Sequence, residues 1–246
     1  MPPKGKGLLV ATLVAAITSG AAGCGNSEAT KTESQSFPLP GEVLRIDASE
    51  AAVKVISGTG ESVDVQRELK GKATDDGNAT WTMSGDTLKL GLRCSGIVVS
   101  CEGRYTVAVP QGTALRVNAS GSAVTLDSLT GDIDASVTDD GTLRVAGPTG
   151  KLSLATRGGS ITVTSARSTE VTAQTKGDGN IDLGFLMAPE RVKATASGSV
   201  QVTLPNDSGT YRIVGADSAS LASDDKSSRS ITVSAADGTA SVQRAG

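Results

Sequence analysis

The C-terminal half of the chain repeats itself about every 19 residues. Apolar residues recur at steps of 18, 19, 19, 21 and 19 residues, and a glycine or an aspartate follows each of them six positions later. These two residue types adopt a positive φ angle more readily than most, so the pattern predicts the same backbone corner in every repeat. Units of this kind cannot bury their apolar faces alone and must stack on one another. The repeat starts are Leu115, Ile133, Leu152, Val171, Val192 and Tyr211, and the predicted turn residues are Gly121, Asp139, Gly158, Gly177, Gly198 and Asp217.

Alternating apolar and polar residues predict short, half-buried strands throughout the folded part. No stretch beyond the N-terminal segment sustains a helical period, so we expect essentially no helix. Nothing between the repeats suggests a helical crossover, and successive coils of about 19 to 20 residues should pair as parallel strands on each face. The predicted fold is an all-β solenoid over residues 42–246. Its last coil, with a polar excursion over residues 217–229, is expected to cover the open end.

The composition argues against several classes of function. The chain contains no histidine, which removes the commonest general base and the commonest transition-metal ligand. Aromatic residues make up only 2% of the chain, too few to build the stacking platforms that usually hold glycans or single-stranded nucleic acid. A formal net charge of −3 offers no electrostatic footprint for nucleic acid. We therefore predict no nucleic-acid partner, no catalytic residues, no cofactor and no metal site.

The N-terminal residues are typical of an export signal. Lys4 and Lys6 precede an apolar run over residues 8–17 and small residues over 19–23, which predicts a signal segment over residues 1–23. The segment that ends in Cys24 resembles the bacterial lipobox, whose cysteine is lipidated, although Ala21 stands where leucine is usual. We expect a lipid anchor on Cys24 at the outer face of the bacterial cytoplasmic membrane, with plain secretion as the alternative. The polar residues 24–41 predict a flexible tether.

The other two cysteines, Cys94 and Cys101, enclose a short loop. In an exported chain the default expectation is a disulfide between them, and lipidation of Cys24 would then account for the odd cysteine count. A redox or metal role is the less favoured alternative, because two cysteines at this spacing without histidine match no recognised catalytic or zinc pattern.

Several segments of the chain resemble one known family. Residues 105–112 (YTVAVPQG), 115–122 (LRVNASGS), 129–133 (LTGDI) and 196–200 (ASGSV) are similar to the bacterial "putative adhesin" domain of β-strand repeats, a domain of unknown function often found on exported lipoproteins. The resemblance covers about residues 43–242 and lies in strands and turns. It implies a right-handed parallel β-helix or a closely related solenoid. The family has no catalytic residues that could be transferred to this chain.

Four acidic residues, Asp132, Asp134, Asp139 and Asp140, gather in one repeat. Glycan-cleaving enzymes use pairs of carboxylates, so a catalytic site is one interpretation. Asp139 and Asp140 also occupy the predicted corner just before Gly141, however, and turn geometry alone accounts for them. We therefore favour the structural interpretation.

A second acidic string, Asp178 to Asp182, resembles the start of a calcium-binding loop. It has Leu183 in place of the loop's glycine and Pro189 in place of its bidentate glutamate. A structural turn is the favoured interpretation, and weak calcium binding is the alternative.

The sequence thus predicts a non-enzymatic cell-surface module that acts in binding, adhesion or as a structural scaffold. Its expected partners are the membrane, through the lipid anchor, and an envelope protein or wall polymer. The competing hypothesis is a glycan-active enzyme, a polysaccharide lyase or hydrolase on a β-helix frame. Such an enzyme needs a groove lined by paired carboxylates and aromatic side chains.

Overall fold

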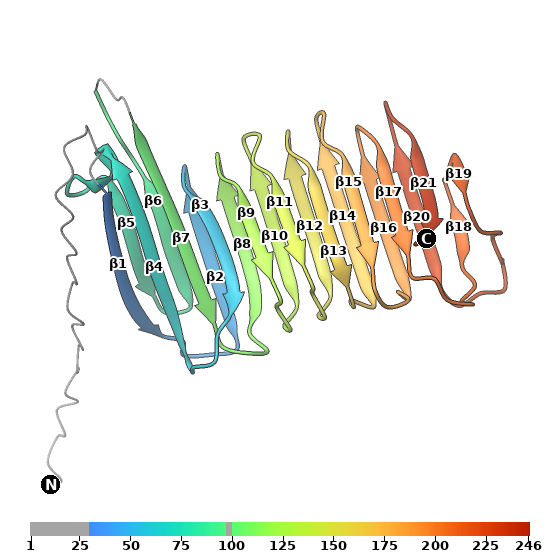
Figure 1. Cartoon of the computed structure of the whole chain (residues 1–246), viewed down its shortest axis with the longest axis horizontal. Coiled ribbons are helices and arrows are strands. Elements are labelled where there is room, and N and C mark those ends of the chain that lie inside the picture. Colours follow the sequence, from blue (N-terminus) through green and yellow to red (C-terminus); the bar gives the residue numbers. More distant parts are fainter. Residues whose placement is uncertain (1–29, 97–99) are drawn as a thin grey trace, which may run out of the picture.

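The computed structural model describes residues 30–96 and 100–246, and within them the protein is all-β with two mixed sheets (Figure 1). The only helical residues in these ranges form a 3₁₀ turn, η1 (Lys72–Thr74). The eleven-stranded sheet has the spatial order β1 (Thr30–Pro38), β4 (Ser62–Gly71), β7 (Cys101–Val109), β3 (Ala52–Ser57), β9 (Val124–Asp127), β11 (Leu143–Ala146), β13 (Ile161–Ala166), β15 (Ile181–Phe185), β17 (Val200–Leu204), β21 (Ala240–Arg244) and β19 (Ser218–Ala219). The ten-stranded sheet has the order β18 (Arg212–Val214), β20 (Ser230–Ala235), β16 (Arg191–Ala196), β14 (Glu170–Lys176), β12 (Leu152–Arg157), β10 (Ile133–Thr138), β8 (Ala114–Ser120), β2 (Val43–Ser49), β6 (Thr87–Leu92) and β5 (Ala79–Ser84).

In the body of the molecule the chain alternates between the two sheets. We call one strand of the ten-stranded sheet and the strand that follows it in the other sheet a unit; the body comprises the units β8/β9, β10/β11, β12/β13, β14/β15 and β16/β17. Each strand pairs in parallel with the equivalent strands of the neighbouring units, which confirms the predicted pairing on each face. The predicted repeat starts lie in register, in the order Leu115, Ile133, Leu152, Val171 and Val192.

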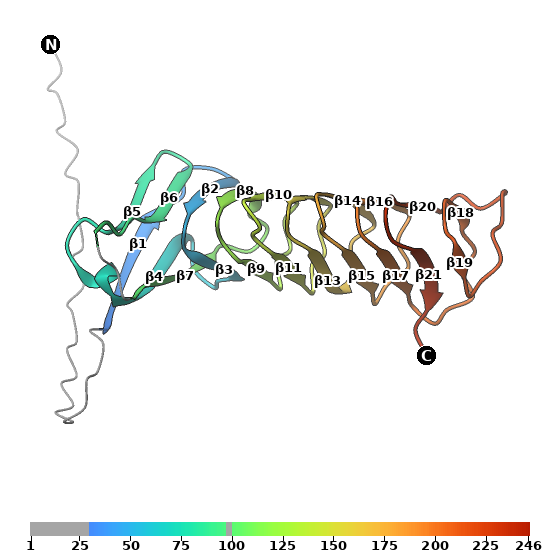
Figure 2. The ribbon, with the colours of Figure 1, turned by 90° about the horizontal axis from the view of Figure 1, so that it is seen from above.

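The core lies between the two sheets, which face each other along the whole stack (Figure 2). In β10, for example, Ile133, Ala135 and Val137 are buried, whereas Asp134 and Ser136 point away from the core. Because the parallel register sets equivalent residues next to each other, apolar side chains from successive units stack into continuous columns. This burial of small and branched side chains is the main stabilising term of the body.

At both ends the order of strands in space departs from their order in the chain (Figure 2). The first unit, β2/β3, lies between β6/β7 and β8/β9, and the last, β20/β21, lies between β16/β17 and β18/β19. Val192 therefore pairs with Ile231, and Tyr211 immediately precedes the outermost strand, β18. The prediction that Tyr211 starts the next stacked repeat is wrong, because the chain first forms the outer layer and then returns inward.

The folded part begins earlier than the sequence indicates. Residues Thr30–Pro38, predicted to belong to the flexible tether, form the edge strand β1, which pairs antiparallel with β4. This strand was missed because its residues are almost all polar and exposed, and only Phe37 is buried. Cys24 and the predicted signal segment lie outside the described residues. Within the described part, no helix is long and apolar enough to cross a membrane.

Candidate functional site

Four of the six predicted turn residues have the positive φ angle that the repeat pattern predicts. Gly121, Asp139, Gly158 and Gly177 have φ angles of 60°, 58°, 87° and 82°. The left-handed backbone that the repeat demands explains the choice of glycine at these sites, and Asp139 tolerates it with help from its neighbours. The hydroxyls of Ser120 and Thr138 donate hydrogen bonds to its carboxylate, at 2.7 and 3.1 Å.

Gly198 does not have this left-handed conformation and belongs to a different column of glycines. An added Cβ atom at Gly159 would collide with the carbonyl oxygen of Gly141, and one at Gly179 would collide with that of Gly159. The next member, Gly198, would place a Cβ atom against the side-chain oxygen of Asn180 and 3.0 Å from the carbonyl oxygen of Gly179. Close stacking of backbone on backbone, rather than a positive φ angle, requires glycine here. The column comprises Gly141, Gly159, Gly179 and Gly198.

Asp217 likewise has a role other than the predicted one, since it is not among the residues with a positive φ angle. Its side chain accepts a hydrogen bond from the backbone N–H of Ala240 at 2.8 Å, and its own N–H donates to the Ala240 carbonyl at 2.8 Å. The residue thus ties the outer layer at the C-terminal end to β21.

The four clustered carboxylates lie towards opposite ends of one strand. Asp132 precedes β10 and accepts a hydrogen bond from the backbone N–H of Lys151 at 2.8 Å. Asp134 lies on the outer face of β10, next to Arg116 in β8. Asp139 and Asp140 follow the other end of the strand, both with positive φ angles. Local backbone structure therefore accounts for Asp132, Asp139 and Asp140.

The calcium-like string is also part of a corner. The side-chain oxygen of Asn180 accepts a hydrogen bond from the backbone N–H of Ser199 at 2.7 Å. The backbone N–H of Asn180 donates to the hydroxyl of Ser160 at 3.1 Å. Asn180 therefore links three stacked units. Among the described residues, no three cysteine, aspartate or glutamate side chains gather where they could hold a metal ion.

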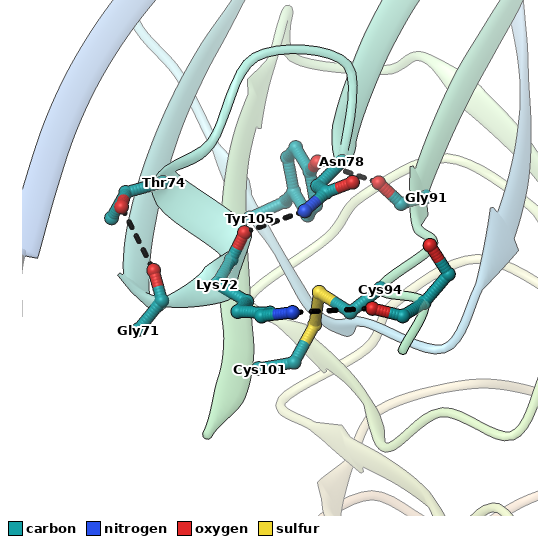
Figure 3. The surroundings of a disulfide bond; sticks show 9 residues. Gly71, Lys72, Thr74, Asn78, Gly91, Cys94, Cys101 and Tyr105 are labelled. Carbon is teal, nitrogen blue, oxygen red and sulfur yellow. Dashed lines mark hydrogen bonds between the residues drawn. A yellow bond between two sulfur atoms is a disulfide. The ribbon is translucent and has the colours of Figure 1, made fainter. Parts of the chain in front are cut away.

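The predicted disulfide is present between Cys94, just after β6, and Cys101, the first residue of β7 (Figure 3). It joins the two sheets near the 3₁₀ turn. Around it, the ammonium of Lys72 donates to the carbonyl of Ser95 at 3.3 Å, and the side-chain amide of Asn78 donates to the Lys72 carbonyl at 2.8 Å. These contacts indicate a structural bond, because the disulfide lies within a network that fixes the adjoining loops.

A charged and aromatic cluster closes the N-terminal end, and no sequence pattern predicted it. Arg67 in β4 has a side chain only 12% exposed, forms an ion pair with Glu33 of β1 at 2.5 Å, and stacks 4.2 Å from the ring centre of Trp81 in β5. It also donates to the carbonyl of Ala79 at 3.0 Å. Arg67 thereby connects strands from both sheets.

Tyr105 completes the closure of this end. Its hydroxyl lies 3.0 Å from the carbonyl oxygen of Thr80 and 3.1 Å from that of Gly91, and the residue is fully buried. Burial raises the pKa of the Tyr105 phenol above its ordinary value of 10.0, although the charge of Arg67 opposes this effect. The phenol is therefore a structural hydrogen-bond donor at neutral pH.

Among the described residues, an open cleft of about 740 Å³ is formed by the loops that join β1 to β2, β3 to β4 and β7 to β8. Its polar side chains include Glu42, Glu61 and Gln111, and no lysine or arginine lines it. Two carboxylates on separate loops can contact a cationic or hydroxyl-rich ligand. The lining includes no aromatic side chain, so it lacks the platform that usually holds a sugar ring.

The outer faces of the two sheets are the other extended surfaces. On the eleven-stranded sheet the residues that point outward from β9 to β17 are mostly small or polar, among them Thr125, Thr162 and Thr203. The outer face of the ten-stranded sheet carries more charge, with Arg116, Asp134 and other ionic residues. Both faces are continuous along the stack and available for contact.

No protein-family model matches the chain, and no curated protein matches it either. Two solved structures have a similar fold. A "putative adhesin" from Bacteroides fragilis NCTC 9343 is 18% identical, with a TM-score of 0.56, and the match covers 90% of this chain and 100% of that one. A "putative adhesin" from Parabacteroides distasonis ATCC 8503 is 12% identical, with a TM-score of 0.50, over 90% of this chain and 98% of that one. The chain thus shares its fold with bacterial proteins named as adhesins, which confirms the resemblance found in its sequence.

Proposed function

We propose that the protein is a non-enzymatic binding module of the bacterial cell surface that acts in adhesion or as a structural scaffold. The observation that carries the proposal is the pair of long, continuous outer faces. The exposed side chains are mostly short and polar on the eleven-stranded sheet and polar or charged on the ten-stranded sheet. Such faces suit broad contact with an extended partner better than enclosure of a small substrate. The names of the two structures with a similar fold support the same role.

The finer architecture in this proposal is a right-handed parallel β-solenoid. The alternation of the chain between the two sheets supports it, as does the parallel register from unit to unit. A solenoid gives a rigid, elongated body whose faces lengthen with each added unit. That shape would hold a binding face away from the cell envelope.

The proposed location is the outer face of the cytoplasmic membrane, with a lipid on Cys24. The export-type N-terminal segment and the small residues before Cys24 support it. In a bacterial host, Cys24→Ala should release the protein into the medium or leave its precursor uncleaved, and Ala21→Leu should improve processing. An unchanged membrane fraction in the Cys24→Ala variant would contradict the anchor and favour another mode of attachment.

The binding role is tested by incubating residues 30–246 with purified envelope polysaccharides and measuring both retention and new reducing ends. We expect retention without new reducing ends. Cleavage that is abolished by Asp132→Ala or Asp134→Ala would overturn the proposal and establish a glycan-active enzyme instead. Because Asp132 also supports a backbone contact to Lys151, circular dichroism of each variant must confirm that it is folded.

A further inference from the structure

The strands of the two sheets differ in net charge. In the ten-stranded sheet the strands contain eight basic and three acidic residues, a net charge of +5, in a chain whose formal net charge is −3. In the eleven-stranded sheet they contain seven basic and six acidic residues, a net charge of +1. The eight basic residues are Arg45, Lys89, Arg116, Arg157, Lys176, Arg191, Lys193 and Arg212.

The charge concentrates on the neighbouring strands β12, β14 and β16. Arg157 and Lys176 lie directly opposite each other in the parallel ladder, both exposed. Lys193 projects from the next strand opposite Thr172, four residues along from the level of Lys176. Within residues 30–96 and 100–246, none of these three makes an ion pair. The anionic side chain of these strands, Glu170, is already paired with Lys151 at 3.3 Å and Arg191 at 3.1 Å. We call Arg157, Lys176 and Lys193 the basic patch.

The position of Arg157 beside Lys176 sets two like charges next to each other, with the carboxylate of Asp139 as a favourable charge neighbour of Arg157. Like charges directly opposite each other on adjacent strands destabilise a sheet. Nothing in the packing requires them, because both point away from the core and equivalent positions in the sheet hold uncharged residues such as Ser120 and Thr138. An anion between the two side chains would turn this repulsion into a favourable contact.

We infer that the outer face of the ten-stranded sheet binds a linear, phosphodiester-linked wall polymer along the long axis of the stack; this rests on the proposed role as a binding module. Guanidinium groups match phosphate oxygens in a two-pronged geometry, and lysine supplies point charges beside them. Arg116 in β8 and Arg45 in β2 extend the row of basic residues beyond the basic patch, with Asp134 beside Arg116 and Asp86 paired with Arg45 at 3.2 Å. Across the strands from β2 to β16, the basic residues extend over roughly 24 Å, which fits a polymer rather than a single anion.

The same face is poorly suited to a lipid surface. Among the described residues, the exposed large apolar side chains are Leu186 and Met187, just after β15, and Val214 in the terminal strand β18. None of them projects from the strands β8 to β16 that carry the basic patch. Membrane-surface segments combine basic residues with apolar side chains that enter the headgroup region, and this face lacks the second element.

The test uses fluorescently labelled poly(glycerol phosphate) and residues 30–246, with fluorescence anisotropy at two salt concentrations. The triple variant Arg157→Gln, Lys176→Gln, Lys193→Gln should weaken binding at least about tenfold and reduce the salt dependence. The matched control is Lys54→Gln, Arg104→Gln, Arg144→Gln, which removes the same charge from outward positions on the other sheet. It should leave the affinity within about twofold, and thermal unfolding should show both variants folded.

Three outcomes would overturn the inference: no binding by the unchanged protein, an equal loss in both triple variants, or binding to anionic phosphatidylglycerol vesicles without binding to the polymer. The first two leave the proposed function intact if a neutral wall polysaccharide or an envelope protein is still retained. Cleavage of an added polysaccharide would instead defeat the proposed function, so the two failures are distinguishable.

Discussion

The body of the stack and its N-terminal end are held together by different means. In the body, parallel ladders repeat one set of contacts, apolar side chains stack on their equivalents, and glycines allow backbone to lie against backbone. At the N-terminal end, antiparallel strands are joined by a disulfide and by the contacts of Arg67 with Glu33, Trp81 and Ala79. The body relies on contacts that recur with the period of the sequence. The end relies on contacts that occur once.

This difference follows from what each region has to bury. A unit in the body has a neighbour on both sides, so one pattern of residues serves every interface. The last strands at an end have a neighbour on one side only and expose a row of backbone groups. The C-terminal end meets the same problem with short strands and with Arg244, which donates to the carbonyl of Pro205 at 3.1 Å and pairs with Asp207 at 2.9 Å.

The glycine column of the body gives the largest expected effect. Gly159→Ala would drive a Cβ atom into the carbonyl oxygen of Gly141, and because this contact is backbone on backbone it cannot be relieved by a side-chain rotation. We expect a loss of about 3 kcal/mol in the free energy of unfolding, measured by urea denaturation. The control is Gly184→Ala, whose Cβ atom would find its nearest neighbour at an ordinary 3.5 Å. Equal stability of the two variants would refute the stacking role.

The disulfide at the N-terminal end is expected to contribute slightly less. Replacing both Cys94 and Cys101 by serine removes the constraint on a loop of about eight residues, which corresponds to about 2.5 kcal/mol of stabilisation. Hydrogen exchange should accelerate in β6 and β7 and stay slow in the body strands β12 and β14. Uniform acceleration along the stack would show that the end and the body unfold as one unit.

Arg67→Met tests the charged cluster of the same end. Methionine keeps most of the packing against Trp81 but leaves Glu33 with only Lys31 as a partner, and we expect a loss of about 2 kcal/mol because the pair with Arg67 is only partly buried. Exchange should accelerate first in β1, whose pairing with β4 the arginine supports. Arg104→Met on the neighbouring strand β7, exposed on the outer face, serves as the control. A similar loss in both variants would mean that the cluster has no special role.

The same contrast decides how far the sequence could predict the structure. The spacing of Leu115, Ile133 and Leu152 predicted the register of the body because each contact there is repeated at the period of the sequence. The spacing of 19 residues between Arg157 and Lys176 was a comparable signal, and it could have placed these two charges side by side. The contacts of Arg67 have no such period. These contacts join residues of three strands that only the completed fold brings together, so no local sequence pattern predicts the contacts.

The strand order at the ends was unpredictable for a related reason. A repeat pattern predicts that consecutive units stack consecutively, and Tyr211 fits the pattern as well as Ile231 does. They differ in their position relative to the long polar segment between them. The sequence reveals this segment but not that it forms the outer layer of the stack. Likewise, β1 offers one buried residue, Phe37, and its other residues are indistinguishable from a tether. A polar segment can form an ordered strand when it pairs with a neighbouring strand, and composition alone does not predict this.

The smallest expected effect is a pH dependence confined to the N-terminal end. Burial on its own raises the pKa of the Glu33 carboxyl, but hydrogen bonds and charges from Lys31 and Arg67 outweigh it and hold the pKa below its ordinary value of 4.5. A lowered pKa in the folded state means that the ionised form stabilises the fold above pH 4.5 and that this contribution is lost as the pH falls through the folded value.

The contribution of Glu33 should be less than about 1 kcal/mol, because solvent screens a pair at the edge of the sheet. It is measured as the difference in unfolding free energy between the unchanged protein and Glu33→Gln, which should be largest near pH 6 and shrink towards pH 3. In the body, hydrogen bonds from Ser120 and Thr138 also lower the pKa of Asp139, but that carboxylate is fully exposed. The change in unfolding free energy caused by the substitution should therefore vary more with pH for Glu33→Gln than for Asp139→Asn. If the Asp139 variant changed more steeply with pH, the charged contacts that matter for folding would lie in the body and not at the end.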